Sequence, residues 1–204
     1  MLTSNVPKHY ICFGVWLAGR RRGRPTGRRG VLSQPASSQT AVRGQIREAK
    51  ATADFSRLRD GLPPQRLRTD KMRKGVPLTD EDRFPWLEAL RDAVGKIMSS
   101  SKNVTLTCSA LQKKYREILR SADADYKPGQ YTSCRVKFIC LEAPVEVIAD
   151  RIRRRSKEGK HFMPVSLLQS QLDLLQIDEA EGVIRVDATM SREAILESIL
   201  TSHF

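Results

Sequence analysis

The sequence has no long apolar run, no Cys-x-x-Cys pair and no cluster of histidines. Because no apolar stretch approaches the roughly 20 residues of a membrane-spanning helix, we expect a soluble protein with no membrane partner. The four cysteines are scattered, and Cys108 and Cys140 lie inside apolar runs, which favours buried thiols in a reducing compartment. The histidines, His9, His161 and His203, are too far apart to indicate a metal site, and we predict none.

Acidic residues are also missing from residues 1–47, which contain nine basic residues. Residues 1–70 hold 14 Lys and Arg against 4 Asp and Glu, whereas residues 71–204 hold 22 against 19. Most of the net charge of +13 therefore belongs to the first third of the chain. A basic chain of this kind would favour polyanion binding if the charge were spread evenly. Because it is not, we regard a nucleic-acid partner as the weakest alternative.

An Arg-rich, Ser-bearing and acid-free segment is typical of an organellar transit peptide. Gly and Pro interrupt residues 19–30, however, which disfavours an amphipathic helix. A disordered tail, or a segment translated from an altered first exon or reading frame, is the alternative. We therefore divide the chain into a largely disordered basic segment, residues 1–69, and a folded domain, residues 70–204. The expected location is cytoplasmic, or a plastid or mitochondrion if residues 1–47 are a transit peptide.

From residue 70 onward, the patterns of helix and strand alternate. The predicted strands are residues 104–108, 136–141 and 183–187, which are β-branched or continuously apolar. The predicted helices start at Pro85, at a Ser109 cap, at Pro144 and at Pro164, with a last helix near residues 195–200. Strands that alternate with helices imply βαβ crossovers. We therefore predict an α/β domain with a parallel sheet flanked by helices.

Three motifs follow one another in this domain. The first consists of Lys71-Met72, Gly75-Val76-Pro77-Leu78, Asp80-Glu81-Asp82-Arg83 and Pro85-Trp86-Leu87. The second is Cys108-Ser109-Ala110-Leu111 with Tyr115-Arg116, and the third is His161-Phe162-Met163-Pro164 with Leu167-Leu168, Ser170-Gln171 and Leu174. Together they resemble the motifs of gluconokinases, small P-loop kinases of sugar acids. The resemblance covers residues 70–204 and implies a P-loop kinase-like fold.

The resemblance implies a site for the sugar acid made by Arg83, Ser109 and Arg116. A guanidinium can bind a carboxylate with two parallel hydrogen bonds, so Arg83 and Arg116 are the candidates for the acid group. Ser109 follows a predicted strand, and ligands of α/β sheets collect at the carboxyl ends of strands. Family members usually have Lys or Arg directly after the Cys-Ser-Ala-Leu motif, where this chain has Gln112.

The third motif implies a lid over ATP. Arg151 and Arg155 are four residues apart and share a helical face, so they would neutralise charge on the transferred phosphoryl group. His161 would order the lid. A solvated basic face is the alternative interpretation of these arginines.

Relatives also have an N-terminal strand, a phosphate loop that ends in Gly-Lys-Ser/Thr, and an acidic segment with the catalytic base. Here Gly14 and Gly19 have the spacing of such a loop, but Arg20 and Arg21 follow them, so the hydroxyl that would bind Mg²⁺ is missing. We interpret the two glycines as coincidence and leave the catalytic residues unassigned. Loss of the first strand should leave a gap in the sheet, partly filled by residues 10–14.

The predicted function is a gluconokinase-type phosphotransferase, which uses ATP and, by resemblance, Mg²⁺ to convert D-gluconate to 6-phosphogluconate. One alternative is a non-catalytic relative that binds the sugar acid or a partner. The other is a basic nucleic-acid-binding protein. A monomer and a homodimer both remain open.

Overall fold

The computed structural model describes residues 9–17, 65–100, 104–159 and 163–203. Over these residues the sheet has the strand order β2-β1-β3-β4, with β1 at His9–Leu17, β2 at Val104–Cys108, β3 at Val136–Ala143 and β4 at Ile184–Asp187. The helices around it are α3 (Gln65–Arg73), α4 (Asp80–Ser99), α5 (Lys113–Arg120), α6 (Val145–Lys157), α7 (Leu168–Asp173) and α8 (Arg192–His203). Short 3-10 turns lie at Val165–Leu167 and Glu179–Glu181. Within the described ranges, no helix combines the length and apolarity that a membrane span requires.

The predicted strands are confirmed, and the α/β class with them. β2 has the predicted bounds, β3 extends two residues further to Ala143, and β4 starts one residue later than predicted. β3 and β4 pair in parallel. β1 is the exception, because it pairs antiparallel with both β2 and β3. The sheet is therefore mixed, with β2, β3 and β4 running one way and the central β1 running the other.

β1 fills the predicted gap, but over more residues than expected. Its last residue, Leu17, pairs with Val104 and Val136, the first residues of β2 and β3. The chain therefore leaves β1 beside the amino ends of β2 and β3, at the opposite end of the strands from their carboxyl ends. Gly14 lies inside the strand, where it pairs with Thr107 and Ile139, so it does not begin a loop.

The predicted boundary between residues 69 and 70 does not match the fold. It falls inside α3, which begins at Gln65, and β1 from the first segment belongs to the sheet. The rest of the predicted disordered segment, residues 1–8 and 18–64, lies outside the described residues, as does most of the predicted transit peptide.

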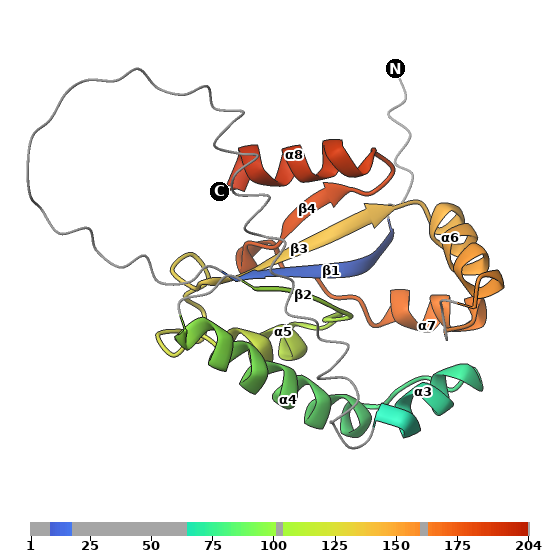
Figure 1. Ribbon diagram of the computed structural model, residues 1–204, viewed down its shortest axis with the longest axis horizontal. Coiled ribbons are helices and arrows are strands. Elements are labelled where there is room, and N and C mark those ends of the chain that lie inside the picture. The colour runs from blue at the N-terminus through green and yellow to red at the C-terminus, as the bar shows by residue number, and fades with distance from the viewer. Residues whose placement is uncertain (1–8, 18–64, 101–103, 160–162, 204) are drawn as a thin grey trace, which may run out of the picture.

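The two faces of the sheet are covered by different helices (Figure 1). One face packs with α4 and α5 around Leu87, Leu119 and Phe138. The other packs against α8, where Ile184 and Val186 meet Ile195 and Ile199. A third cluster, at the carboxyl end of β3, joins α6 and α7 to the sheet through Ala143, Ile148, Ile152, Leu168 and Ala188. This burial of apolar surface fixes the strand ends at which the predicted site residues lie.

Two predicted helix starts are wrong. α4 begins at Asp80, because the Asp82 carboxylate accepts a hydrogen bond from the Thr79 amide at 3.0 Å and so stabilises the first turn. Pro85 lies inside this helix on its exposed side. Ser109 does not cap α5, which begins at Lys113 after Gln112.

Candidate functional site

The predicted site residues come from α4, from α5 and the connection before it, and from α6. Ser109 directly follows β2, and α6 starts two residues after β3. The ends of β3 and β4 are joined by the Ala188 amide, which donates to the Glu142 carbonyl at 2.7 Å. In Figure 1 the ends of β3 and β4 point toward α6. The fold therefore has, on this side, the carboxyl ends of parallel strands at which α/β proteins bind ligands.

The acidic turn of the first motif ties three helices together. Asp82 accepts a hydrogen bond from the Lys71 ammonium at 2.6 Å, which joins α4 to α3. Asp80 accepts from the Tyr115 hydroxyl at 2.6 Å and from the Lys114 ammonium, which joins α4 to α5. The hydrogen bond from Lys114 is the main cause that lowers the pKa of Asp80. The hydrogen bond from Lys71 is the main cause that lowers the pKa of Asp82. Both carboxylates are thus charged and already occupied at neutral pH.

Arg83 is almost completely buried, with 2% of its surface exposed. Its Nε donates to the Leu78 carbonyl at 3.4 Å, and its guanidinium carbon lies 5.6 Å from the centre of the Tyr115 ring. None of the described carboxylates forms an ion pair with it, because Asp80 and Asp82 bind lysines instead. Burial lowers the pKa of Arg83 from its ordinary value, whereas the nearby charges of Asp80 and Asp82 oppose the shift. A buried cation without a carboxylate partner is the group that an anionic ligand would stabilise.

Ser109 lies in the four-residue connection between β2 and α5 and is half-buried. Within the described part of the chain, its hydroxyl forms no hydrogen bond, so it can bind a ligand hydroxyl or anion. Because α5 begins four residues later, the predicted support from the helix N-terminus does not reach Ser109.

Arg116 is placed differently from the prediction. Its side chain is fully buried, and Nε and Nη2 donate to the two carboxylate oxygens of Glu181 at 2.9 and 2.7 Å. The remaining donors bind the carbonyls of Ala110, Leu111 and Gln176 at 2.8, 3.1 and 2.5 Å. All five N–H donors of the guanidinium are thus used inside the protein. We therefore propose that Arg116 holds the turn after β2 in place, instead of the predicted contact with substrate.

The predicted lid arginines line a cavity of about 540 Å³ beside the ends of β3 and β4. Arg151 donates to the Ala188 carbonyl at 2.8 Å, and the Arg155 Nε donates to the Arg151 carbonyl at 3.3 Å. Sequence reasoning missed two further arginines of this cavity, Arg154 and Arg192. Arg154 is adjacent to a predicted residue, whereas Arg192 starts α8 and carries no signal in its local sequence. His161 lies outside the described residues.

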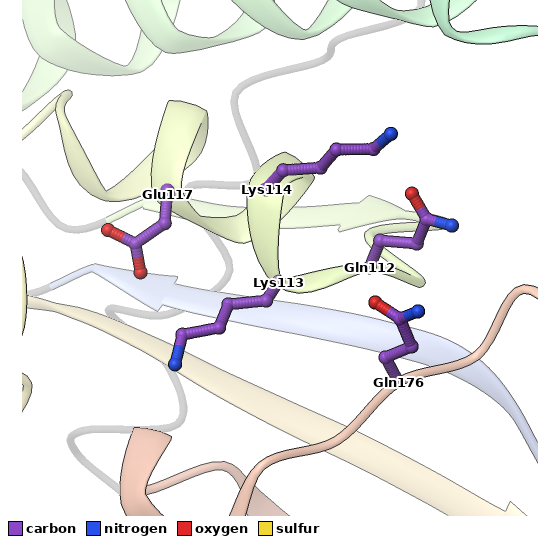
Figure 2. A pocket seen from close by; sticks show the side chains of 5 residues that line it. All are labelled: Gln112, Lys113, Lys114, Glu117 and Gln176. Atoms are coloured by element: carbon purple, nitrogen blue, oxygen red, sulfur yellow. The ribbon is translucent and has the colours of Figure 1, made fainter.

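A second cavity, of about 500 Å³, lies beside the start of α5 (Figure 2). It is lined by Gln112, Lys113, Lys114, Glu117 and Gln176. Its charged groups are already paired: Lys113 with Asp178 at 2.9 Å, Lys114 with Asp80, and Glu117 with Arg120 at 2.7 Å. Figure 2 shows Lys113 and Lys114 extending in opposite directions from α5. Both lysines that follow Gln112 are thus paired with carboxylates at the surface of this structure.

Comparison with known proteins decides the family. No family model matches the chain. A gluconokinase of Arabidopsis thaliana is 53% identical over 131 residues, which cover 64% of this chain and 69% of the relative. The chain belongs to the gluconokinase family. The thermoresistant gluconokinase of Escherichia coli (strain K12) is 31% identical over 203 residues, 98% of this chain and 96% of the relative.

The structural comparison agrees with the sequence comparison. The unliganded crystal structure of a sugar kinase from Janibacter sp. HTCC2649 is similar with a TM-score of 0.58 and 34% identity, over 80% of this chain and 85% of that chain. The predicted resemblance is thus confirmed at the level of family and fold. In this gluconokinase-family chain, the first and second motifs meet through the Asp80–Tyr115 hydrogen bond, and α6 lies at the strand ends.

Proposed function

We propose that this chain is a gluconokinase-type phosphotransferase, which transfers the γ-phosphoryl group of ATP to the terminal hydroxyl of D-gluconate. The observation that carries the proposal is Arg83, a buried guanidinium in a family motif with which none of the described carboxylates forms an ion pair. A sugar acid supplies the missing negative charge, because its carboxylate can accept charge-assisted hydrogen bonds from the guanidinium. Ser109, directly after β2, is the proposed second partner for the substrate.

The arginine-lined cavity is the proposed site of ATP, the phosphoryl donor of this kinase family. Four arginines and one glutamate line it, so it has an excess of positive charge. Arg151 and Arg155 are the proposed phosphate contacts of the lid, together with His161 from the third motif. Their positive charge would stabilise the charge on the transferred group.

Mg²⁺ is implied by the family, but the described residues do not fit it. They contain no group of three or more His, Cys, Asp or Glu that could hold a metal ion. The sequence also has no Gly-Lys-Ser/Thr segment, whose hydroxyl would bind the ion. We therefore assign no residue of this chain to Mg²⁺ and no step of the reaction to a metal held by the protein.

Neither alternative function is favoured. The relatives named above are gluconokinases and a sugar kinase, which does not favour nucleic-acid binding. The basic excess lies in residues 1–70, of which only β1 and part of α3 are described. A non-catalytic relative would still bind the sugar acid, so turnover and binding have to be measured separately.

Substituting Arg83→Ala is expected to weaken gluconate binding by about 1.5–3 kcal/mol, the usual contribution of a hydrogen bond to a charged group. Isothermal titration of the full chain with D-gluconate measures the change. The matched control is Arg91→Ala, which removes an arginine from the same helix whose guanidinium pairs with Asp92 at the surface. Unchanged affinity of a folded Arg83→Ala variant would mean that Arg83 serves only the packing against Tyr115.

A further inference from the structure

A second arginine, Arg68, lies near Arg83 in the same part of the fold. It belongs to α3, which packs beside α4, and its guanidinium carbon lies 4.3 Å from the centre of the Trp86 ring. Its Nε is buried and has no hydrogen-bond partner among the described residues. Buried donors in native proteins nearly always have a partner. The orphaned Nε therefore points to a ligand that completes the site.

Arg68 and Arg83 are close enough to repel each other. Burial, and then the charge of Arg83, lower the pKa of Arg68 to about 10, whereas the charge of Asp82 opposes the shift. The carboxylates that could neutralise the pair are engaged elsewhere, Asp82 by Lys71 and Thr79, and Asp80 by Lys114 and Tyr115. Glu81, the remaining acid of the turn, is exposed. The two guanidinium groups thus form a local excess of positive charge inside the protein.

The aromatic rings fix both groups without using their hydrogen-bond donors. A guanidinium is planar, and it interacts with an aromatic ring through its face, whereas its N–H groups lie at its edge. The guanidinium carbon of Arg68 lies 4.3 Å from the centre of the Trp86 ring, and that of Arg83 lies 5.6 Å from the centre of the Tyr115 ring. Among the described residues, the pair makes one hydrogen bond, from Arg83 Nε to the Leu78 carbonyl at 3.4 Å, so the terminal N–H groups of both side chains remain for a ligand.

We propose that Arg68 and Arg83 together bind the carboxylate of the sugar acid, with Arg68 as a specificity-determining residue outside the three family motifs. The inference rests on the proposed function and extends its site to α3. Two guanidinium forks can bind both oxygens of one carboxylate, which accepts about four hydrogen bonds. A neutral sugar in the same position would leave both cations uncompensated, so the pair selects for acids.

The test is isothermal titration of the full chain with D-gluconate, using two variants of Arg68. Arg68→Met keeps an apolar side chain on Trp86 and removes the charge, whereas Arg68→Lys keeps the charge. Arg73→Met, at the exposed end of the same helix, is the matched control. We expect Arg68→Met to weaken binding between about 10- and 150-fold, the range for a hydrogen bond to a charged group. Arg68→Lys should recover part of that loss, and Arg73→Met should stay within about twofold of the unaltered chain.

The outcomes separate this inference from the function on which it rests. If Arg68→Met binds gluconate as the unaltered chain does, Arg68 only packs on Trp86 and the inference is wrong, whereas the proposed function stands. Equal losses in the Met and Lys variants would also overturn it, because charge would then play no part. If the unaltered chain binds no gluconate, both the proposed function and this inference are wrong. Thermal unfolding of each variant shows that a loss of binding is not a loss of fold.

Discussion

Substituting Glu181→Gln is expected to lower the free energy of unfolding by about 3–5 kcal/mol, the cost of removing one partner from a buried ion pair. Glu181 is the shared partner of two buried arginines: it accepts bonds from Arg116 at 2.9 and 2.7 Å and from Arg120 at 2.9 Å. Glutamine keeps the size of the side chain but removes its charge. Two cations would then lie in the core beside a neutral amide, whose one oxygen cannot replace the two charged oxygens that now bind Arg116 and Arg120.

Urea unfolding of the unaltered chain and of the Glu181→Gln variant measures this difference in the free energy of unfolding. The matched control is Glu179→Gln in the same 3-10 turn, where the side chain is exposed and the change should stay within about 0.5 kcal/mol. Similar unfolding curves for both variants would contradict the prediction and show that Glu117, which also binds Arg120, compensates for the loss.

The same substitution should change the dependence of stability on pH. Burial alone would raise the pKa of Glu181, but the hydrogen bonds and charges of Arg116 and Arg120 lower it below its ordinary value of 4.5. A lowered folded-state pKa stabilises the protein fully above the unfolded value, and this contribution is lost as the pH falls through the folded value. The stability difference between the unaltered chain and Glu181→Gln should therefore be constant at neutral pH and shrink below about pH 4.5.

The sequence was informative where local pattern and chemistry agree. β2 and β3 were predictable because runs such as Val104–Cys108 are β-branched and bounded by polar residues. The order of motifs identified the family before any fold was known. Arg83 was placed in the site by its motif, and its burial without an ion pair agrees with a binding role that awaits measurement.

The rest depends on contacts between distant residues, which local pattern does not contain. Arg116 was expected at the substrate because it belongs to a family motif and its guanidinium can bind a carboxylate, but its partner Glu181 lies 65 residues further along the chain. Arg68 was overlooked because the chain was divided at residue 70, whereas α3 begins at Gln65. The direction of β1 was equally hidden, since a short apolar run predicts a strand but not which way it enters a sheet.

The direction of β1 leads to the prediction with the largest expected effect, which concerns the rate of turnover. We expect the polypeptide of residues 1–204 to be a poor kinase, which releases ADP in response to gluconate far more slowly than a chain with a family phosphate loop. Phosphoryl transfer needs the phosphates held, a metal positioned and the nucleophile aligned, with little covalent chemistry from the protein. A family phosphate loop would have to lie at the carboxyl ends of β2 and β3, near Cys108 and Ala143. β1 ends instead beside Val104 and Val136, at the amino ends of β2 and β3.

A chimera tests this expectation. A strand and a Gly-x-x-x-x-Gly-Lys-Ser segment from a family member replace residues 1–64, so that α3 and Arg68 are kept. Gluconate-dependent ADP release should rise at least about a thousandfold, the scale of a single strong transition-state contact in phosphoryl transfer. The matched control is the same chimera with the loop lysine changed to methionine, which should return to the level of the unaltered chain. Robust turnover by residues 1–204 themselves would refute the prediction, and Gly14 to Arg21 would then have to be treated as a phosphate loop.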